Sequence, residues 1–404
     1  MASFQGYLDI LNTNTRRPQI KIELLREEDE TVYSEITADI MNSSGEIAVQ
    51  RQNGVRQSID LTLINIEGDY LPDFDNGIWW RNKFKASLGY TESDDSIFWH
   101  PMGVYCLENP IATSNYSEKT LQIHGIDKFS VMDGSLGGET DYTYIVPVGT
   151  NIYTAIQAVL TLVGDKKAPI LDVVYKDEVT PYTIEIEIGG IISDVLIKLA
   201  EMVSAFVYYN SEGHLVFAKD DDDSEKASLY DFTTDEYNYM GANRTYKFNE
   251  LYNAALVIGD NINGEIFDAK VQNNNLLSDV SIPNVGFERV KVINDANIYS
   301  DALAIERAKY ELKLATALQS SISITCVSMF HLEVDSVITI NDSSIGLLGA
   351  RYLINGFRIP LNIGGSMSLD IVDVKEFEFD YWWLTIKGDK IWHIIVHMTT
   401  SKSL

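Results

Sequence analysis

The feature that most constrains the fold is a pair of alternating runs near the C-terminus, in residues 351–374, RYLINGFRIPLNIGGSMSLDIVDV. Phe357 and Ile359 flank Arg358 before the Gly-Gly pair, and Leu369 and Ile371 flank Asp370 after it. Successive side chains of a strand point to opposite faces, so period-two alternation on both sides of a glycine turn predicts an antiparallel hairpin.

A similar unit stands roughly 250 residues earlier in the chain. Residues 103–127 and 349–373 each contain a glycine, a tyrosine, a strand, a loop, Leu-x-Ile and a closing aspartate. The spacing from the tyrosine to the leucine is 16 positions in the first unit and 17 in the second. Antiparallel hairpins share part of this pattern in any case, so generic β patterning and duplication both stay open here.

Length and composition indicate a folded protein of two to four domains. The chain has 404 residues, 45% of them hydrophobic and 11% aromatic. Its 59 acidic and 31 basic side chains give a net charge of −28. Binding to nucleic acid or anionic membrane depends on Lys and Arg, so this balance argues against both. An acidic surface of this kind would suit the wall of a channel through which DNA slides without adhering.

The cysteines and the hydropathy pattern indicate a chain made in the cytoplasm. Cys106 and Cys326 cannot form a multi-disulfide framework, and they fit a reducing compartment. The first residues, MASFQGYLDILNTNTRRP, lack the apolar core of a signal peptide. No apolar run reaches the roughly 18–20 residues of a membrane helix, so we expect no membrane insertion.

Hydrophobic periodicity divides the chain into β-rich and mixed segments. Alternating strands fill most of the first 135 residues. A helix is predicted after Thr150 as N-cap, another at 191–205, followed by a short hairpin, and a long one at 300–318 with Ser300 as N-cap. The expected units are a first β-barrel at 1–137, a small α+β domain at 138–245, a second barrel at 246–375 that includes the long helix, and an appendage at 376–404.

The motifs tested for chemistry favour structural roles. His393 and His397 have helical metal-site spacing, but no third ligand or zincin glutamate accompanies them, so they are weak metal candidates. Asp220, Asp221, Asp222 and Asp223 lack the alternating ligands of a calcium loop. No nucleophile, phosphate-binding or dinucleotide signature surrounds either cysteine or any other segment. The sequence therefore predicts no enzyme and no cofactor.

Aromatic clusters are the candidate interface residues, since aromatics concentrate at interface hot spots. Core packing is favoured for Trp79 and Trp80. Tyr381, Trp382, Trp383 and Trp392 lie in the appendage, where core and interface roles remain equally open.

Several segments occur in a suggestive order: VRQSIDLTLINIEGDYLPDF, WWRNKFKASLGY, LQIHGIDKF, IISDVLIKLAEMVSAFVYYNSEGHLVF, NELYNAALVIGDNINGEIFDA, and the strands from FHLEVDSVITIND to MSLDIVDV. In their order and residue patterns, over roughly residues 20–375, they resemble the central hub proteins of phage and phage-like tail baseplates. The resemblance is closest to hub proteins from tails that attack Gram-positive bacteria. The resemblance implies a β-rich α+β chain with two tail-tube-like antiparallel β-barrels, an inserted small α+β domain and a short C-terminal appendage.

The resemblance also implies an assembly role. Three chains would form a pseudo-six-fold ring that joins the hexameric tail tube to a trimeric spike and surrounds the DNA exit channel. Its implied partners are the tail tube protein or a distal tail ring, the spike or tip protein, the tape measure protein and the baseplate wedge. The candidate channel-lining residues lie in two acidic loops: Glu92, Asp94 and Asp95, and Asp220–Asp223.

Two other function classes stay open at this point. Some relatives continue into a peptidoglycan hydrolase domain, whereas this sequence ends soon after the second predicted barrel, so a hydrolase-related protein without its catalytic part is one alternative. A cell-wall-binding or glycan-binding tip protein is the other. The virion tail is the expected location in each case, after synthesis in the host bacterial cytoplasm.

Overall fold

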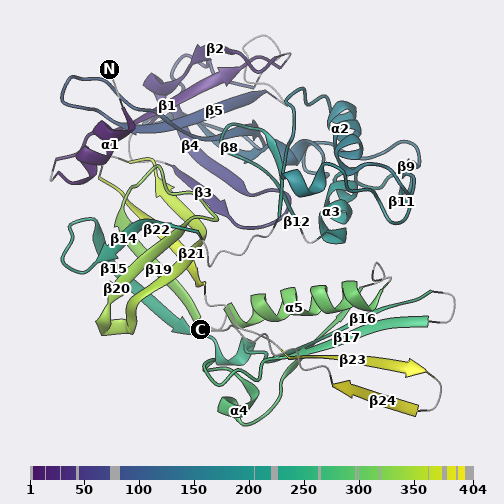
Figure 1. Cartoon of the computed structure of the whole chain (residues 1–404). Helices are drawn as coiled ribbons and strands as arrows, with labels where there is room; N and C mark the ends of the chain where they lie inside the picture. Colours follow the sequence, from purple (N-terminus) through teal and green to yellow (C-terminus); the bar gives the residue numbers. More distant parts are fainter. Residues whose placement is uncertain are drawn as a thin grey trace.

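The structure is a computed structural model (Figure 1). It describes residues 3–13, 15–27, 29–41, 45–72, 82–203, 205–219, 226–262, 265–295, 298, 300–317, 320–362, 364–374, 380–387 and 390–395. The predicted β-rich α+β class is confirmed, with two barrels and two smaller α+β units.

The first barrel contains eight strands: β1 (Pro18–Leu25), β2 (Val32–Glu35), β3 (Glu46–Gln50), β4 (Gln57–Ile64), β5 (Lys83–Tyr90), β6 (His100–Leu107), β7 (Ile111–Ser114) and β8 (Lys119–Asp127). Its sheet runs β3-β4-β8-β6-β5-β1-β2. The segment after β2 closes it, because Ile36 donates its N–H to Ile22 O (3.0 Å) in β1 and Met41 donates to Thr62 O (2.8 Å) in β4.

The second barrel is built from β14 (Ser228–Thr233), β15 (Tyr239–Tyr246), β19 (Ser320–Val327), β20 (Val337–Asp342), β21 (Leu347–Pro360) and β22 (Ser366–Asp373). Their pairing order is β14-β20-β21-β22-β19-β15. The sheet curls so that its outer strands meet: the rings of Phe232 on β14 and Tyr239 on β15 lie 6.2 Å apart. Figure 1 shows this barrel beside and below the first.

The two barrels contain the same five-strand sheet. The order β3-β4-β8-β6-β5 in the first matches β15-β19-β22-β21-β20 in the second, with every pair antiparallel. Even the register agrees, since Tyr105 pairs with Asp127 and Tyr352 pairs with Asp373. The repeat suspected from the hairpins is therefore a duplicated sheet, and the copies differ at the next strand, where β1 is antiparallel to β5 but β14 is parallel to β20.

A small α+β domain, the insert domain, follows β8. It comprises β9 (Tyr144–Val146), α2 (Ile152–Val163), β10 (Ile170–Leu171), β11 (Ile184–Ile186), α3 (Ser193–Met202), β12 (Ala205–Tyr209) and β13 (Leu215–Lys219). The N-cap of α2 is Asn151, whose side chain accepts from Thr154 N–H (3.2 Å), and not the predicted Thr150. The Thr150 hydroxyl instead donates to Pro147 O (2.7 Å), which closes the preceding turn.

The remaining unit, the distal domain, differs from the predicted division of the chain. It contains β16 (Ala254–Ile262), β17 (Glu265–Gln272), α4 (Ile282–Val285), β18 (Val290–Asn294), α5 (Asp301–Ala317), β23 (Asp380–Lys387) and β24 (Lys390–Ile395). Its sheet order is β18-β16-β17-β23-β24, and α5 packs on β16 and β17 (Figure 1).

Three boundaries therefore change. Strands β14 and β15 belong to the second barrel although they begin before residue 246, and α5 belongs to the distal domain. The predicted appendage supplies two strands of that domain's sheet. Alternation identifies a strand but does not tell which sheet it joins, which explains the difference. The predicted cap of α5 is present, since Ser300 Oγ accepts from Leu303 N–H (3.2 Å).

Candidate functional site at the junction of the barrels

The two barrels are joined by one strand pair into a single 14-stranded sheet. β3 pairs antiparallel with the second half of β21, with Ile47 opposite Ile359 and Val49 opposite Phe357. These four side chains are at most 7% exposed and lie in a hydrophobic core that contains residues of both barrels. The barrel junction, defined here as this β3–β21 pair, is thus a continuation of the sheet and of the core.

The N-terminal helix α1 (Phe4–Leu11) makes a second contact between the two barrels, away from the β3–β21 pair. Tyr7 is fully buried, its Oη accepts from Phe330 N–H (2.8 Å), and it hydrogen-bonds His331 Nδ1 (3.1 Å). Its ring lies 4.4 Å from that of His100 in the first barrel. Burial lowers the pKa of both histidines to about 4, so both are neutral at pH 7. The helix therefore connects the barrels through an aromatic cluster.

A charged clamp holds the insert domain against both barrels. Arg51 and Arg56, in the β3–β4 loop, both pair with the carboxylate of Asp335, which precedes β20. The Arg51 guanidinium lies 4.3 Å from the ring centroid of Phe206, and that of Arg56 lies 3.8 Å from Tyr208. Burial alone raises the pKa of Asp335, but the two guanidiniums more than offset it and hold the pKa below its usual value. We call these five residues the clamp.

A second ionic cluster fixes the insert domain to the first barrel. The Lys128 Nζ is 2.8 Å from Glu30 Oε1 and 2.8 Å from Asp165 Oδ2, and its side chain is 1% exposed. Glu30 also pairs with Lys83 (2.6 Å) and Lys167 (3.1 Å). Burial raises the pKa of Glu30, but its lysine partners outweigh this and lower it to about 2. Each carboxylate of the cluster is held by a cation, so the cluster positions domains and offers no free base.

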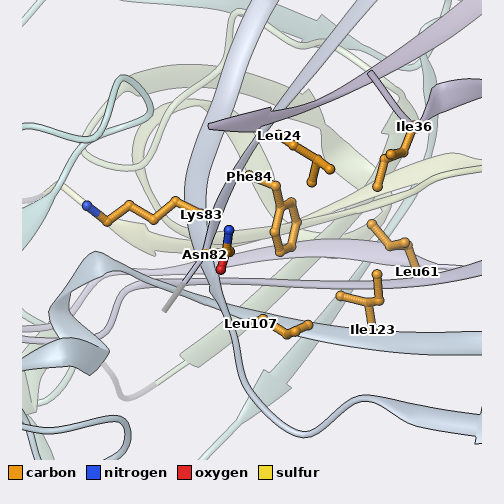
Figure 2. Close-up of a pocket in the computed structure, with 8 residues that line it drawn as sticks. All are labelled: Leu24, Ile36, Leu61, Asn82, Lys83, Phe84, Leu107 and Ile123. Atoms are coloured by element: carbon orange, nitrogen blue, oxygen red, sulfur yellow. The ribbon is translucent and has the colours of Figure 1, made fainter. Parts of the chain in front are cut away.

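A small pocket in the first barrel is packing space and not a ligand site. Figure 2 shows apolar side chains from several strands around it, including Leu24, Leu61, Phe84 and Ile123, while the polar end of Lys83 extends away. The pocket has room for no more than about one water molecule.

The acidic loop expected in the channel lies between β5 and β6, where its side chains have local partners. Glu92 accepts from Ser3 N–H (3.0 Å), beside the start of α1. Asp94 accepts from Ser96 N–H (3.1 Å), and Asp95 is exposed with φ of +62°. Whether the loop faces a channel stays a prediction.

The other sequence candidates lie on the last two strands or outside the described residues. Tyr381, Trp382 and Trp383 lie on β23, and Trp392 and His393 lie on β24. Outside the described residues lie Trp79, Trp80, Asp220, Asp221, Asp222, Asp223 and His397. Within the described ranges, no three His, Cys, Asp or Glu side chains are grouped to hold a metal ion, and no helix is long and apolar enough to span a membrane. Cys106 and Cys326 are both buried and unpaired with each other.

The sequence reading missed the junction and the clamp. Arg51, Arg56 and Asp335 are far apart in the chain, and the loop 51–56 reads as an ordinary hairpin turn. The sequence also contains a repeat within the insert domain: residues 140–163 and 180–203 each begin with Thr-x-Tyr-Thr, at a 40-residue spacing. In the structure the two copies form reciprocal backbone hydrogen bonds: Gly149 N–H donates to Thr180 O (2.7 Å), and Gly189 N–H donates to Thr140 O (2.7 Å).

Comparisons with known proteins agree with this architecture. No protein-family model and no curated protein matches the chain. Solved structures do match: a tail protein from Neisseria meningitidis has TM-score 0.61 at 13% identity, covering 88% of this chain and 96% of that one. A 43 kDa tail protein of prophage MuSo2 from Shewanella oneidensis has TM-score 0.58 at 13% identity, covering 88% and 98%.

A third match is prophage tail protein gp18 from Listeria monocytogenes, with TM-score 0.53 at 11% identity, covering 87% of this chain and 94% of that one. At such identities the likeness establishes the fold. Each match spans nearly the whole length of the neighbour. The resemblance expected from the order of segments is confirmed: this chain has the fold of prophage tail proteins.

Proposed function

We propose that the protein is a structural hub of a phage or phage-like tail baseplate. In this role three chains form a ring of six barrels, which joins the hexameric tail tube to a trimeric spike or tip and surrounds the DNA exit channel. The partners implied by the resemblance are the tail tube protein or a distal ring, the spike, the tape measure protein and the baseplate wedge. The protein acts without catalysis.

The observation that carries this proposal is the duplicated sheet. A ring of six similar barrels built from three chains needs two copies of one barrel per chain, held in a fixed relation. The five-strand sheets supply the copies, and the β3–β21 pair, α1 and the clamp supply the fixed relation. Closed rings of this kind use one heterologous contact repeated around the axis.

The charge is consistent with the same role. Three chains would carry −84, three times the −28 of one chain. A channel wall of this sign repels the phosphate backbone, so DNA passes without adhering. The residues that would line the channel remain the candidates of the acidic loops.

Native mass spectrometry with negative-stain imaging tests the proposal. We expect a mass of three chains of 45.4 kDa and a ring with an open centre. A zymogram on Gram-positive cell walls and a glycan-binding assay address the two alternatives. A chain that stays monomeric at its highest soluble concentration and digests or binds cell wall would overturn the hub function.

A further inference from the structure

The duplication allows the two barrels to be matched residue by residue through their pairing registers. Tyr105↔Asp127 corresponds to Tyr352↔Asp373, so residues 109–113 correspond to 356–360 once the bulge in each strand is counted. In the same way Ile59 corresponds to Ile322, each opposite the same position of its neighbouring strand. Since Ile47 pairs with Ile59 and Arg244 pairs with Ile322, residues 46–50 correspond to 243–247.

This correspondence shows that each chain contains one joined and one open copy of the same junction. β21 and β3 pair with each other. Their counterparts are β7, which follows β6 in the first barrel, and β15 in the second. Among the described strands, β7 pairs only with β8 and β15 pairs only with β19, so each has one free edge. An unpaired edge presents a row of N–H and C=O groups to a further strand.

We propose that β7 of one protomer pairs antiparallel with β15 of the next, in the register of the intramolecular β3–β21 pair. The proposal rests on the ring proposed above and names its contact. The register places Ile111 opposite Thr245 of the partner subunit, and Ala112 opposite Arg244 of the partner subunit. Repetition of this head-to-tail contact gives every barrel the neighbour that the first barrel already has in the monomer.

The side chains at the free edges match in size as those at the barrel junction do. Phe357 opposite Val49 is an aromatic ring against a small side chain, and the corresponding positions are Pro110 and Tyr246. The aromatic side chain is on the β21 strand at the barrel junction and on β15, the counterpart of β3, in the proposed contact. The total size of the facing pair therefore stays similar. Tyr246 is 55% exposed in the monomer, and the Arg244 guanidinium lies 4.9 Å from its ring. In the monomer Tyr246 stacks on Phe248, with the ring centroids 5.9 Å apart, and Arg244 Nη1 donates to Ile345 O (3.4 Å). The partner strand in the ring would cover the part of Tyr246 that stays exposed.

Charge favours the same contact. Glu108 and Glu118 flank β7, whereas Arg244 and Lys247 lie on or beside β15. In a chain of net charge −28, most surfaces repel a second copy, and a local pairing of opposite signs selects this one. Pro110 has no N–H, so the contact has one backbone donor fewer than the barrel junction.

Cysteine cross-linking tests the register. In the intramolecular junction the position equivalent to Ile111–Thr245 is Arg358–Ala48, which alternates with the hydrogen-bonded positions marked by Arg51 N–H to Asn355 O (2.7 Å) and Leu361 N–H to Gly45 O (3.0 Å). Cα atoms at such non-hydrogen-bonded pairs lie about 4.5 Å apart, within disulfide range. The double variant I111C/T245C is oxidised and analysed by non-reducing electrophoresis and native mass spectrometry. Native Cys106 and Cys326 are fully buried and give little background.

The expected result is a covalent trimer from I111C/T245C that is lost on reduction. The matched variant A48C/R358C should give a cross-linked monomer, which shows that the register of the barrel junction permits a disulfide. The shifted variant I111C/N243C should cross-link at least ten times less. Native trimers in which I111C/T245C cross-links no better than the shifted variant would overturn this contact and leave the ring intact. The ring itself would be overturned if the wild type forms no trimer by native mass spectrometry and neither I111C/T245C nor I111C/N243C cross-links.

Discussion

Asp335 is the single carboxylate on which the clamp depends, and Asp335→Asn removes its charge while keeping its shape. The residue has φ of +70°, in the left-handed region that asparagine tolerates as well as aspartate does. The substitution therefore leaves backbone strain nearly unchanged. What changes is the partner of the two guanidiniums, Arg51 and Arg56, whose side chains are 9% and 3% exposed.

The expected loss of stability is large because both cations are buried. Removing one partner of a buried ion pair costs about 3–5 kcal/mol, since the remaining charge is left uncompensated. The asparagine carbonyl still accepts one hydrogen bond, and the rings of Phe206 and Tyr208 still face the cations, so we expect about 3 kcal/mol. Asp95→Asn is the matched control: its φ is +62° but its turn is exposed, so its effect should stay within about 0.5 kcal/mol.

Urea unfolding followed by tryptophan fluorescence measures the difference, and limited proteolysis shows whether the insert domain is released. The first transition is the relevant one, because a chain of several domains need not unfold in two states. The folded-state pKa of Asp335 is lowered, so its stabilisation is present above the unfolded value of 3.8 and is lost as the pH falls below it. Equal effects of D335N and D95N at pH 7, or a difference that persists at low pH, would refute the reasoning.

Two further predictions concern the barrels. The free energy of unfolding should fall as the pH decreases from 6.5 to 4. In this range the unfolded chain binds protons at His100 and His331, whereas the folded chain does not, because its two histidine pKa values are lowered to about 4. Each histidine contributes up to about 3 kcal/mol, so the melting temperature of H331Q should depend less on pH than that of the wild type. A melting temperature equally pH-dependent in H331Q would contradict this. Thr339→Pro should abolish ring formation, since β20 lies between β14 and β21 and loses a ladder bond. Normal trimers of T339P by native mass, alongside those of the exposed-site control Leu348→Ala, would count against the second barrel.

Local structure was predictable from the sequence wherever one pattern decided it. Alternation gave the hairpin of β21 and β22 and the strands β19 and β20, and Ser300 marked the start of α5. The pattern failed at Asn355, where a bulge puts Ile354 and Phe357 on the same face of the strand, so that both lie in the barrel core. It also failed for α5, whose residues alternate in charge and show no clear stripe, so that its packing partner was not evident.

The pairing of strands that are distant in the sequence was harder to predict, for a physical reason. The junction of β3 with β21 unites segments about 310 residues apart, and strand pairing depends on backbone groups that every residue carries. Only the duplicated hairpin hinted at it, because two copies of one unit imply a relation between them. The clamp had no local signal, since arginines in a hairpin loop and an aspartate before a strand are common on any surface.

The composition of the two kinds of edge follows from the different problems that they solve. The β3–β21 edges are parts of one chain, so they meet at a high effective concentration, and apolar pairs such as Ile47–Ile359 and Val49–Phe357 carry no risk there. In the proposed ring, β7 and β15 must remain exposed on each monomer until the correct partner arrives. Pro110 and Arg244 suit that condition, because a proline or a charged side chain on an open edge prevents pairing with unrelated strands. The same register can therefore serve twice in one particle, permanently within the chain and selectively between chains.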